Sequence, residues 1–360
     1  MKSNTRNTIF PEEIIFEIFS WLPVKSLVQF RCVSKKIYSL ILEPDFVDTH
    51  HRRSMTRDGG TKFLLRKIEG FYTIKRNEDE KTYKWNPNNR YDYVMYANGL
   101  FCMWKDNVET PRIWNPSTRE VILLPNLRCG SSIHPLTYNY SLGYEPEEKR
   151  YKVLMTQEFK RGSRPTKSWV LTLSIDKEWR EIESMIDFVP SFNRRVCVNG
   201  VIYMLDYKIN KAIVAFDVKG EKFRVIKLWK NFGFNNFGDY NLIDVKGRLG
   251  VVNNLKLFGE ENLWILRNSR WRRHIIRFTR EVKLGNYTSK EICNSCDGEI
   301  VFIVSKWNFT VLYVYDIRKN SWKYLEIQQL PEKGCIYDVF CFAETVFSSP
   351  SLRILRYLDL

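Results

Sequence analysis

The first fifty residues space their apolar side chains as a helix does. Ile14, Ile18 and Leu22 lie four residues apart, so they share one helix face. Pro11 suits the first helical position, because its missing N–H and preset φ cost nothing there. We therefore predict a helix that begins at Pro11 and is stopped by Pro23.

Two further helices and a short basic one are expected after this first helix. Ser26, with Gln29 three residues later, has the pattern of a capping box and is expected to start the second helix. Ser34 is a suitable N-cap for a third helix. Pro44 then begins a short basic helix that runs through His50.

These helices carry more apolar surface than so small a unit can bury alone. Ile15, Phe16, Phe19 and Trp21 are also apolar, so the first helix is apolar nearly all round. One interpretation is an ordinary helical cap that packs against the rest of the chain. The other is a docking module whose surplus apolar face meets a second protein.

From about residue 60 the pattern changes to the alternation typical of β-strands. Short apolar strands follow turn dipeptides, which favour tight hairpins because both positions of a type I′ turn need positive φ. The dipeptides are Asn98-Gly99, Asn199-Gly200, Lys246-Gly247 and Asp297-Gly298. This region is therefore predicted to be a series of hairpins.

A second hairpin follows these first ones at some distance, and it often carries an aromatic side chain. Such aromatics are Trp114, Trp179, Phe223, Trp271 and Trp322. A pair of hairpins recurs about every 45–50 residues, which is the scale of a propeller blade. About six units fit between residues 60 and 350 if the two ends of the domain share one blade. A β-sandwich is the alternative, whereas the lack of long amphipathic helices disfavours parallel α/β.

The expected fold class is α+β with two domains: all-α helices over 6–50 and a mainly-β, propeller-like domain over 60–350. Aromatic residues make up 15% of the 360 residues, enough for a large core. No apolar run approaches the roughly 20 residues that span a bilayer, and the first ten residues lack signal-peptide character. We therefore expect an intracellular protein, cytoplasmic, nuclear or both, without membrane contact and with its eight Cys as free thiols.

Candidate catalytic and metal-binding groups are sparse. Cys293 and Cys296 form a CxxC pair, but a zinc site needs a second ligand pair at suitable spacing. Two of the four His, His50 and His51, fall in the basic linker between the domains. The sequence has no G-x-S-x-G, phosphate-cradling loop or metal-spaced cluster. We therefore predict no enzyme activity and no cofactor.

The net charge of +16 lies entirely after residue 50, because residues 1–50 hold six basic and six acidic side chains. The densest basic group is Arg267, Arg270, Arg272 and Arg273. Arginine can grip carboxylate or phosphate with paired hydrogen bonds, so we expect these residues to bind an acidic or phosphorylated protein. Nucleic acid is the alternative, because Trp264 and Trp271 lie among the arginines and could stack bases. The third interpretation is a solvated hairpin with its Trp in the core.

Two sets of motifs resemble a known plant family. The helical set is Leu22-Pro23-Val24-Lys25-Ser26-Leu27, Phe30-Arg31-Cys32-Val33-Ser34-Lys35, Ser39-Leu40-Ile41 and Pro44-Asp45-Phe46. The β set is Ile113-Trp114-Asn115-Pro116-Ser117-Thr118-Arg119, Leu142-Gly143-Tyr144-Glu145-Pro146 and Val198-Asn199-Gly200-Val201-Ile202-Tyr203. Nearly the whole chain is therefore similar to plant F-box proteins with an F-box-associated, kelch-like domain.

The resemblance implies a non-enzymatic substrate receptor of a Skp–cullin–F-box ubiquitin ligase. Its F-box would dock on a Skp-family adaptor, and through it on cullin, while the β domain would bind an unidentified protein substrate. The implied adaptor contacts are Phe10, Pro11, Ile14, Ile18, Leu22, Pro23, Val24, Leu27, Cys32, Val33 and Leu40. Phe10 stands where the family usually has Leu, and Ile37 where it usually has Trp. A basic propeller that binds nucleic acid or another acidic partner outside a ligase is the alternative function.

Overall fold

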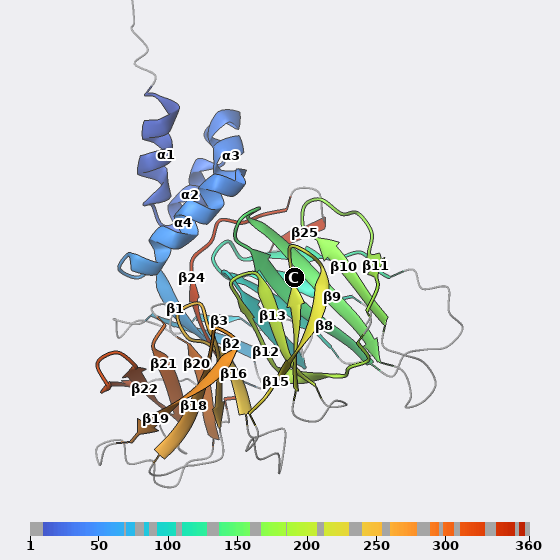
Figure 1. Ribbon diagram of the computed structural model, residues 1–360. Coiled ribbons are helices and arrows are strands. Elements are labelled where there is room, and N and C mark those ends of the chain that lie inside the picture. Colours follow the sequence, from blue (N-terminus) through green and yellow to red (C-terminus); the bar gives the residue numbers. More distant parts are fainter. Residues whose placement is uncertain are drawn as a thin grey trace, which may run out of the picture.

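The structure is a computed structural model in which four helices stand on one side of a β-propeller (Figure 1). It describes residues 10–67, 70–75, 83–85, 92–105, 110–127, 137–158, 167–184, 186–206, 212–229, 240–253, 260–278, 289–294, 298–305, 310–327, 336–349 and 353–356.

The four helices are α1 (Glu12–Ser20), α2 (Val24–Phe30), α3 (Lys35–Leu42) and α4 (Pro44–Thr56), and residues 10–56 are called the helical module below. Ser34 caps α3 as predicted, its Oγ accepting a hydrogen bond from the Ile37 N–H at 3.2 Å. The prediction that Ser26 starts α2 is wrong, because α2 begins at Val24 directly after Pro23. Pro23 suits this place, since it lacks an N–H that would need a partner.

Helix α4 is longer than predicted, and its histidines do not lie in a linker. The helix continues past His50 to Thr56. His50 and His51 are buried, with exposed fractions of 0% and 1%. The spacing of Phe46 and His50 is helical, so the apolar face of α4 extends through the histidines.

Among the described residues, six antiparallel sheets form the blades of the propeller, which confirms the predicted fold and excludes the β-sandwich. Blade 1 holds β24 (Asp338–Ala343), β1 (Thr61–Lys67), β2 (Gly70–Lys75) and β3 (Tyr83–Trp85). Blade 2 holds β4 (Tyr93–Ala97), β5 (Leu100–Trp104), β6 (Arg112–Asn115), β7 (Glu120–Leu123) and β25 (Arg353–Arg356). Blade 3 holds β8 (Thr137–Glu145), β9 (Arg150–Glu158), β10 (Lys167–Thr172) and β11 (Arg180–Ile182).

Blades 4, 5 and 6 each contain four consecutive strands. Blade 4 holds β12 (Pro190–Val198), β13 (Val201–Asp206), β14 (Ala212–Asp217) and β15 (Lys222–Lys227). Blade 5 holds β16 (Tyr240–Asp244), β17 (Leu249–Asn253), β18 (Glu260–Arg267) and β19 (Arg270–Arg277). Blade 6 holds β20 (Ser289–Asn294), β21 (Ile300–Ser305), β22 (Thr310–Asp316) and β23 (Ser321–Ile327).

Strands far apart in the sequence close the ring. Strand β24 pairs with β1 from Thr61↔Ala343 to Arg66↔Asp338, so the two ends of the propeller share blade 1, as predicted. Strand β25 then pairs with β7 and gives blade 2 a fifth strand at its edge. The segment between β24 and β25 must therefore cross from one blade to the next.

The predicted hairpin turns are present and contact one another. Both residues have positive φ in Asn98-Gly99, Asn199-Gly200 and Lys246-Gly247, whereas Asp297 of the fourth turn lies outside the described residues. Asn199 donates through Nδ2 to the Gly247 carbonyl at 3.1 Å. Gly99 lies against His51 of α4, so this row of turns is on the side of the propeller that carries the helices.

The aromatics of the second hairpins join neighbouring blades. Trp179 Nε1 donates to the Pro125 carbonyl at 2.7 Å, and Trp271 Nε1 to that of Lys227 at 2.9 Å. Trp322 Nε1 donates to the Arg277 carbonyl at 3.0 Å, so the same contact recurs in three blades. The packing of Trp271 therefore agrees with the interpretation in which the hairpin is solvated and its Trp lies in the core.

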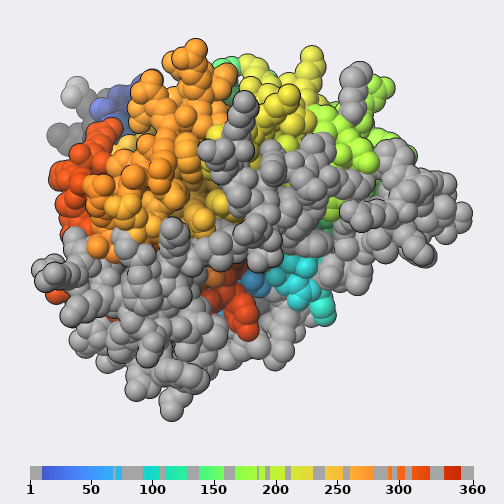
Figure 2. Space-filling view, turned by 60° about the horizontal axis from the view of Figure 1, so that its bottom comes forward, coloured from blue at the N-terminus to red at the C-terminus, as the bar shows by residue number. Residues whose placement is uncertain are grey.

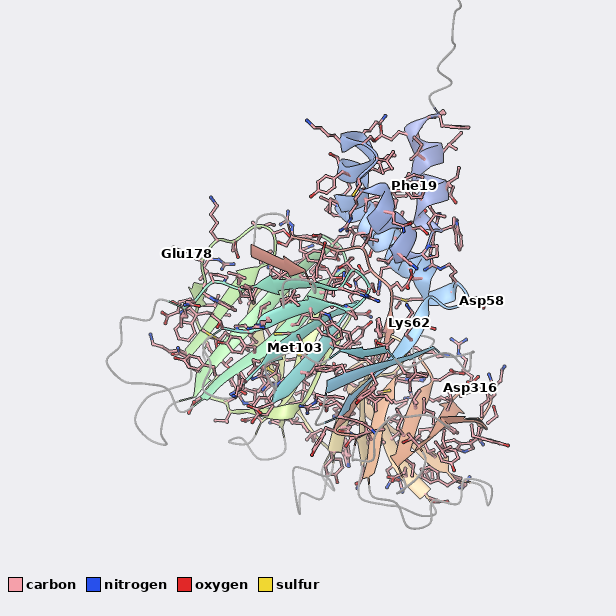
Figure 3. The ribbon with its side chains drawn as sticks, turned by 180° about the vertical axis from the view of Figure 1, so that it is seen from behind. Phe19, Asp58, Lys62, Met103, Glu178 and Asp316 are labelled. Carbon is pink, nitrogen blue, oxygen red and sulfur yellow. The ribbon has the colours of Figure 1, made fainter. Side chains whose placement is uncertain are left out.

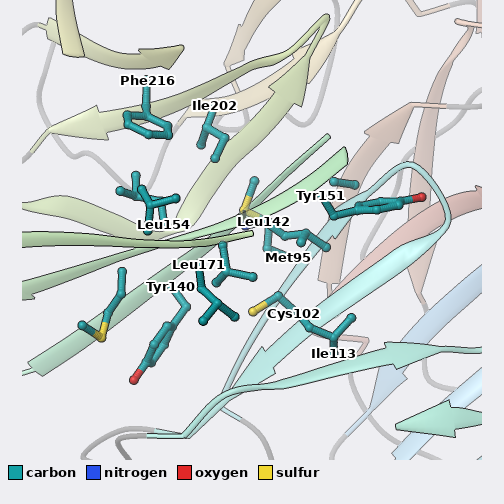
Figure 4. Packing of buried hydrophobic residues seen from close by; sticks show 14 of the residues in the cluster. Met95, Cys102, Ile113, Tyr140, Leu142, Tyr151, Leu154, Leu171, Ile202 and Phe216 are labelled. Carbon is teal, nitrogen blue, oxygen red and sulfur yellow. Dashed lines mark hydrogen bonds between the residues drawn. The ribbon is translucent and has the colours of Figure 1, made fainter. Parts of the chain in front are cut away.

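Apolar side chains fill the space between blades. Figure 4 shows part of one cluster, in which Met95 of blade 2 lies beside Leu142 on one face of blade 3, while Leu154 on the other face lies towards Ile202 of blade 4. These side chains are 0–4% exposed.

Gly143 allows the close approach of blades 3 and 4. A Cβ at this position would lie 2.6 Å from a methyl group of Val218 and 3.0 Å from one of Ile202. Any side chain here would push the two blades apart.

Candidate functional site

The helical module exposes several large apolar side chains to solvent. Figure 3 shows α1, α2 and α3 projecting beyond the sheets, with Phe19 between the helices. The most exposed apolar side chains are Phe10 (64%), Ile14 (44%), Ile18 (54%), Trp21 (48%), Val33 (65%) and Tyr38 (43%). Single apolar residues are normal on a surface, but this many on one small module indicate an interaction surface.

Two contacts bring the exposed residues of α1 close to those of the α2–α3 corner. The rings of Phe19 and Phe30 lie 5.0 Å apart, which joins the end of α1 to the end of α2. Lys36 Nζ lies 2.9 Å from Glu12 Oε2, which joins the starts of α3 and α1. The start of α1 and the start of α3 therefore lie at the same end of the module.

The structure divides the eleven residues expected to touch the adaptor into three groups. Seven are exposed: Phe10, Pro11, Ile14, Ile18, Pro23, Cys32 and Val33. Leu22 is half-buried and packs against the core of the helical module. Val24, Leu27 and Leu40 are only 1%, 0% and 4% exposed.

The structure places Val24, Leu27 and Leu40 inside the module, and their contact with a partner stays a prediction. All three belong to the core of the module, where they pack with Phe46 and with Val346 from the segment after β24. Their role in this arrangement is to support the exposed face. Sequence alone could not separate the groups, because every one of the residues is apolar and lies on or beside a short helix.

Position 37 is also a supporting position. Ile37 is half-buried and packs against the same core, whereas Tyr38 is 43% exposed. The neighbouring ring of Tyr38 therefore stands on the outer surface, while the smaller Ile37 faces inward.

Residues 344–347, called the crossing segment below, hold the module to the propeller. Val346 is fully buried in the module core. Asn115 of blade 2 donates through Nδ2 to the Thr345 and Phe347 carbonyls, each at 3.0 Å. The Phe347 ring lies 4.7 Å from that of Tyr151 in blade 3. The crossing segment thus contacts the helices on one side and two blades on the other.

Glu344 is the most highly connected residue of the crossing segment. Its carboxylate accepts from Arg57 at 2.7 Å, from Lys62 at 2.7 Å and from the Val24 N–H at 3.4 Å. The side chain is 9% exposed, so these interactions are only weakly screened by water. One carboxylate thus joins α2, the end of α4 and strand β1.

Arg31 makes a second link at the end of α2. Its guanidinium donates to the Val346 carbonyl and lies 3.2 Å from the Glu120 carboxylate of blade 2. Both side chains of this ion pair are less than 9% exposed. On α4, Asp48 accepts from the Tyr144 hydroxyl at 2.8 Å, and Asp45 pairs with Lys149, so blade 3 also contacts the module.

The buried histidines His50 and His51 of α4 add two hydrogen bonds, one within the helical module and one to the crossing segment. The Leu22 carbonyl accepts from His50 Nε2 at 3.0 Å, and the Glu344 carbonyl from His51 Nδ1 at 3.1 Å. The other nitrogen of each ring is buried without a hydrogen-bond partner in the part of the chain that the structure describes. Burial lowers the pKa of each ring to about 4. Phe46, Val47, His50, His51 and Ser54 recur at helical spacing, which is the signal that could have revealed this buried face.

The four candidate substrate-binding arginines lie on the outer hairpin of blade 5 and are all exposed. Arg267, Arg270 and Arg272 share one face of this hairpin, as the register Arg267↔Arg270 and Ile265↔Arg272 requires. Arg273 belongs to the opposite face, where its Nε donates to Asn262 Oδ1 at 2.7 Å. The structure therefore brings three of the four together and separates Arg273.

No group of three or more His, Cys, Asp or Glu suited to a metal ion occurs among the described residues. Cys293 is buried, and Cys296 of the CxxC pair lies outside the described residues. No helix in the described ranges has the length and apolar character required to cross a membrane.

Comparison with known proteins identifies relatives of both regions. The model of the F-box associated beta propeller domain matches residues 53–347, and that of the F-box domain matches residues 8–49. The Arabidopsis thaliana sequence named "Putative F-box protein At1g46840" is 30% identical over 356 residues, covering 89% of this chain and 70% of that protein. "Putative F-box protein At1g47790" of the same plant is 28% identical over 379 residues, covering 95% and 94%.

Lowering the pH should weaken the buried contact between the helical module and the propeller. In the unfolded chain both rings titrate near the ordinary pKa of about 6.5, whereas in the folded protein they stay neutral down to about 4. Stability present above pH 6.5 is therefore lost as the pH falls from about 6.5 to 4, by up to about 3 kcal/mol per ring. Urea unfolding at a series of pH values measures this loss.

A variant with both His50→Gln and His51→Asn is the control for the pH series. Each new side-chain amide can place an N–H where the donating ring nitrogen of the histidine was. The amide, however, does not titrate in this pH range. The variant should show a flatter dependence of unfolding free energy on pH. If the unfolding free energy of the variant and of wild type changed equally with pH, the pH dependence could not be assigned to His50 and His51.

Replacing Glu344 should loosen the module more than replacing an exposed carboxylate. Glu344→Gln keeps the shape but leaves Arg57 and Lys62 without a compensating charge, at a cost of about 3 kcal/mol. Glu260→Gln, which breaks the exposed pair with Arg277, should cost less than about 1 kcal/mol. Chemical denaturation compares the two, and equal losses would count against the central role of Glu344.

Proposed function

Because this chain belongs to the plant F-box proteins that carry an F-box-associated β-propeller domain, we propose that it is the substrate receptor of a Skp–cullin–F-box ubiquitin ligase. In this proposal the helical module binds a Skp-family adaptor, and through it cullin, while the propeller binds a protein to be ubiquitinated. The protein acts in the cytoplasm, the nucleus or both.

The exposed apolar side chains of the helical module are the observation that carries this proposal. Phe10, Ile14, Ile18 and Val33 are each 44–65% exposed on a unit whose core is already filled by other side chains. Burying such side chains against a partner contributes about 25 cal/mol per Å² of apolar surface. An apolar adaptor surface is therefore the partner that these side chains favour.

The buried contact between the helical module and the propeller also suits a receptor. Val24, Leu27 and Val346 form a common core, so the module and the propeller share buried structure. A partner on the module and a substrate on the propeller would consequently be held in one relative orientation. The proposed role is non-enzymatic, because its chemistry is supplied by the proteins that the receptor brings together.

The adaptor proposal can be tested with two exposed isoleucines. Ile14→Lys with Ile18→Lys places two charges in the proposed interface, where they would lose water without gaining a partner. Co-purification of a recombinant Skp-family adaptor should fall by about tenfold or more. Thermal unfolding should stay close to that of wild type, because both positions face solvent in the free protein.

The matched control is Ile175→Lys with Val225→Lys, at exposed positions on the propeller (53% and 40%). This variant should retain the adaptor. Leu27→Lys is a poor test, since Leu27 is fully buried and its replacement would unfold the module. Undiminished adaptor binding by the Ile14 and Ile18 variant would refute the proposal.

A further inference from the structure

The outer hairpin of blade 5 holds two arginines directly opposite each other. A two-residue turn, Asn268-Ser269, has positive φ at both positions (47° and 61°) and brings Arg267 into register with Arg270. Arg272 follows two residues later on the same face. Like charges placed directly opposite destabilise a sheet, so this arrangement is unfavourable unless an anion lies between them.

A polar chain holds this hairpin against blade 6. His274 of β19 lies 2.9 Å from the Tyr315 hydroxyl, and that hydroxyl donates to Asn320 Oδ1 at 2.8 Å. Asn320 belongs to the β22–β23 turn, which also carries Arg318 and Lys319. Trp322 adds the hydrogen bond to the Arg277 carbonyl. The turn of blade 6 is thus fastened beside the arginine hairpin.

Five exposed cations therefore meet along this edge, and they are called the basic rim below: Arg267, Arg270, Arg272, Arg318 and Lys319. None of the five side chains forms an ion pair within the described ranges. Figure 2 shows blade 5, in orange, reaching the surface without a cover of other segments, and Figure 3 places Asp316 at the outer margin of the molecule.

The acidic groups near the basic rim are already engaged. Asp316 accepts hydrogen bonds from the backbone N–H groups of Arg318 and Lys319, which together with nearby cations lower its pKa. Glu260 pairs with Arg277 at the far end of the hairpin. Neither carboxylate therefore neutralises the row of arginines.

We propose that the basic rim binds a phosphorylated segment of the protein substrate. A phosphate carries a charge of about −1.5 to −2 and three acceptor oxygens, so one group can neutralise two opposed guanidinium groups. A single carboxylate carries one charge and would leave Arg267 or Arg270 unbalanced. Arginine also offers two parallel donors to a phosphate, which favours a grip at this place over general attraction.

The position of the basic rim fits the proposed receptor function, on which this inference rests. The β18–β19 and β22–β23 turns lie at the same ends of their blades as the β16–β17 turn, because strands of a meander alternate in direction. That end is the side of the propeller on which the helical module stands. A bound segment would consequently lie on the same side as the adaptor.

The test measures binding of two peptide pools to the full chain. One pool has a fixed phosphoserine flanked by random positions, and the other has serine in its place. Wild type should bind the phosphorylated pool more tightly, and Arg270→Glu with Arg272→Glu should weaken this by about tenfold or more. Arg270→Lys with Arg272→Lys keeps the charge but loses the paired donors, so it should lose about threefold or more.

A charge-matched control lies on blade 3. Arg150→Glu with Lys167→Glu changes the net charge equally, at side chains that are 50% and 44% exposed, and should leave peptide binding unchanged. Equal binding of the two pools, or an equal loss in the control variant, would overturn the proposal. If the Lys variant bound the phosphorylated pool as tightly as wild type, paired hydrogen bonds from arginine to the phosphate would be ruled out.

Two further measurements separate this inference from its alternatives. Tighter binding of random single-stranded RNA than of the phosphorylated pool, lost in the Glu variant, would replace the peptide by nucleic acid as the ligand. Adaptor binding is measured in the same samples and should be unchanged by every variant of blade 5. Loss of peptide binding with the adaptor retained therefore tests the basic rim alone, whereas a wild-type chain without adaptor binding contradicts the receptor function instead.

Discussion

The buried carboxylate of Glu344 is the interaction on which the arrangement of the whole chain depends. It joins the start of α2, the end of α4 and strand β1 through Val24, Arg57 and Lys62. It can do so only after β24 has paired with β1, because the pairing places residue 344 beside the module. Closure of the propeller ring and packing of the helical module against it are therefore coupled. The exposed apolar side chains of α1 are thus carried by a module whose position depends on the closed ring.

Local chemistry made much of the fold predictable. The turns at Asn98-Gly99 and Asn199-Gly200 have the positive φ that their residues favour, and Ser34 caps α3. Aromatics recur at matching places because their indole N–H groups bind a carbonyl of the preceding blade, as Trp271 does. The start of α2 was mispredicted, since Pro23 competes with Ser26 as a starting residue and determines where the helix begins.

The candidate site was predictable only in its outline. Apolar excess indicated a docking face, and Ile14 and Ile18 are indeed exposed. The burial of Leu27 depends on Val346, more than 300 residues away in sequence, and no local pattern reports such a partner. The same limit applies to the arginines: alternation alone separates Arg273 from Arg272, but it required a known strand register to say which side each residue occupies.

The distribution of charge follows from these packing constraints. Each inner strand of a blade is enclosed by its neighbours, as the 0% exposure of Val251 and Val252 in β17 illustrates, so charge is excluded there. The outer strands have one free edge, and Lys or Arg at such an edge also opposes pairing with another chain. That function explains isolated cations such as Lys222 and Lys227. It does not explain two arginines in direct register, because alternating signs would protect the edge equally well without repulsion. The opposed pair Arg267 and Arg270 is therefore the part of the surface that structural needs alone leave unexplained, and the proposed anionic ligand would account for it.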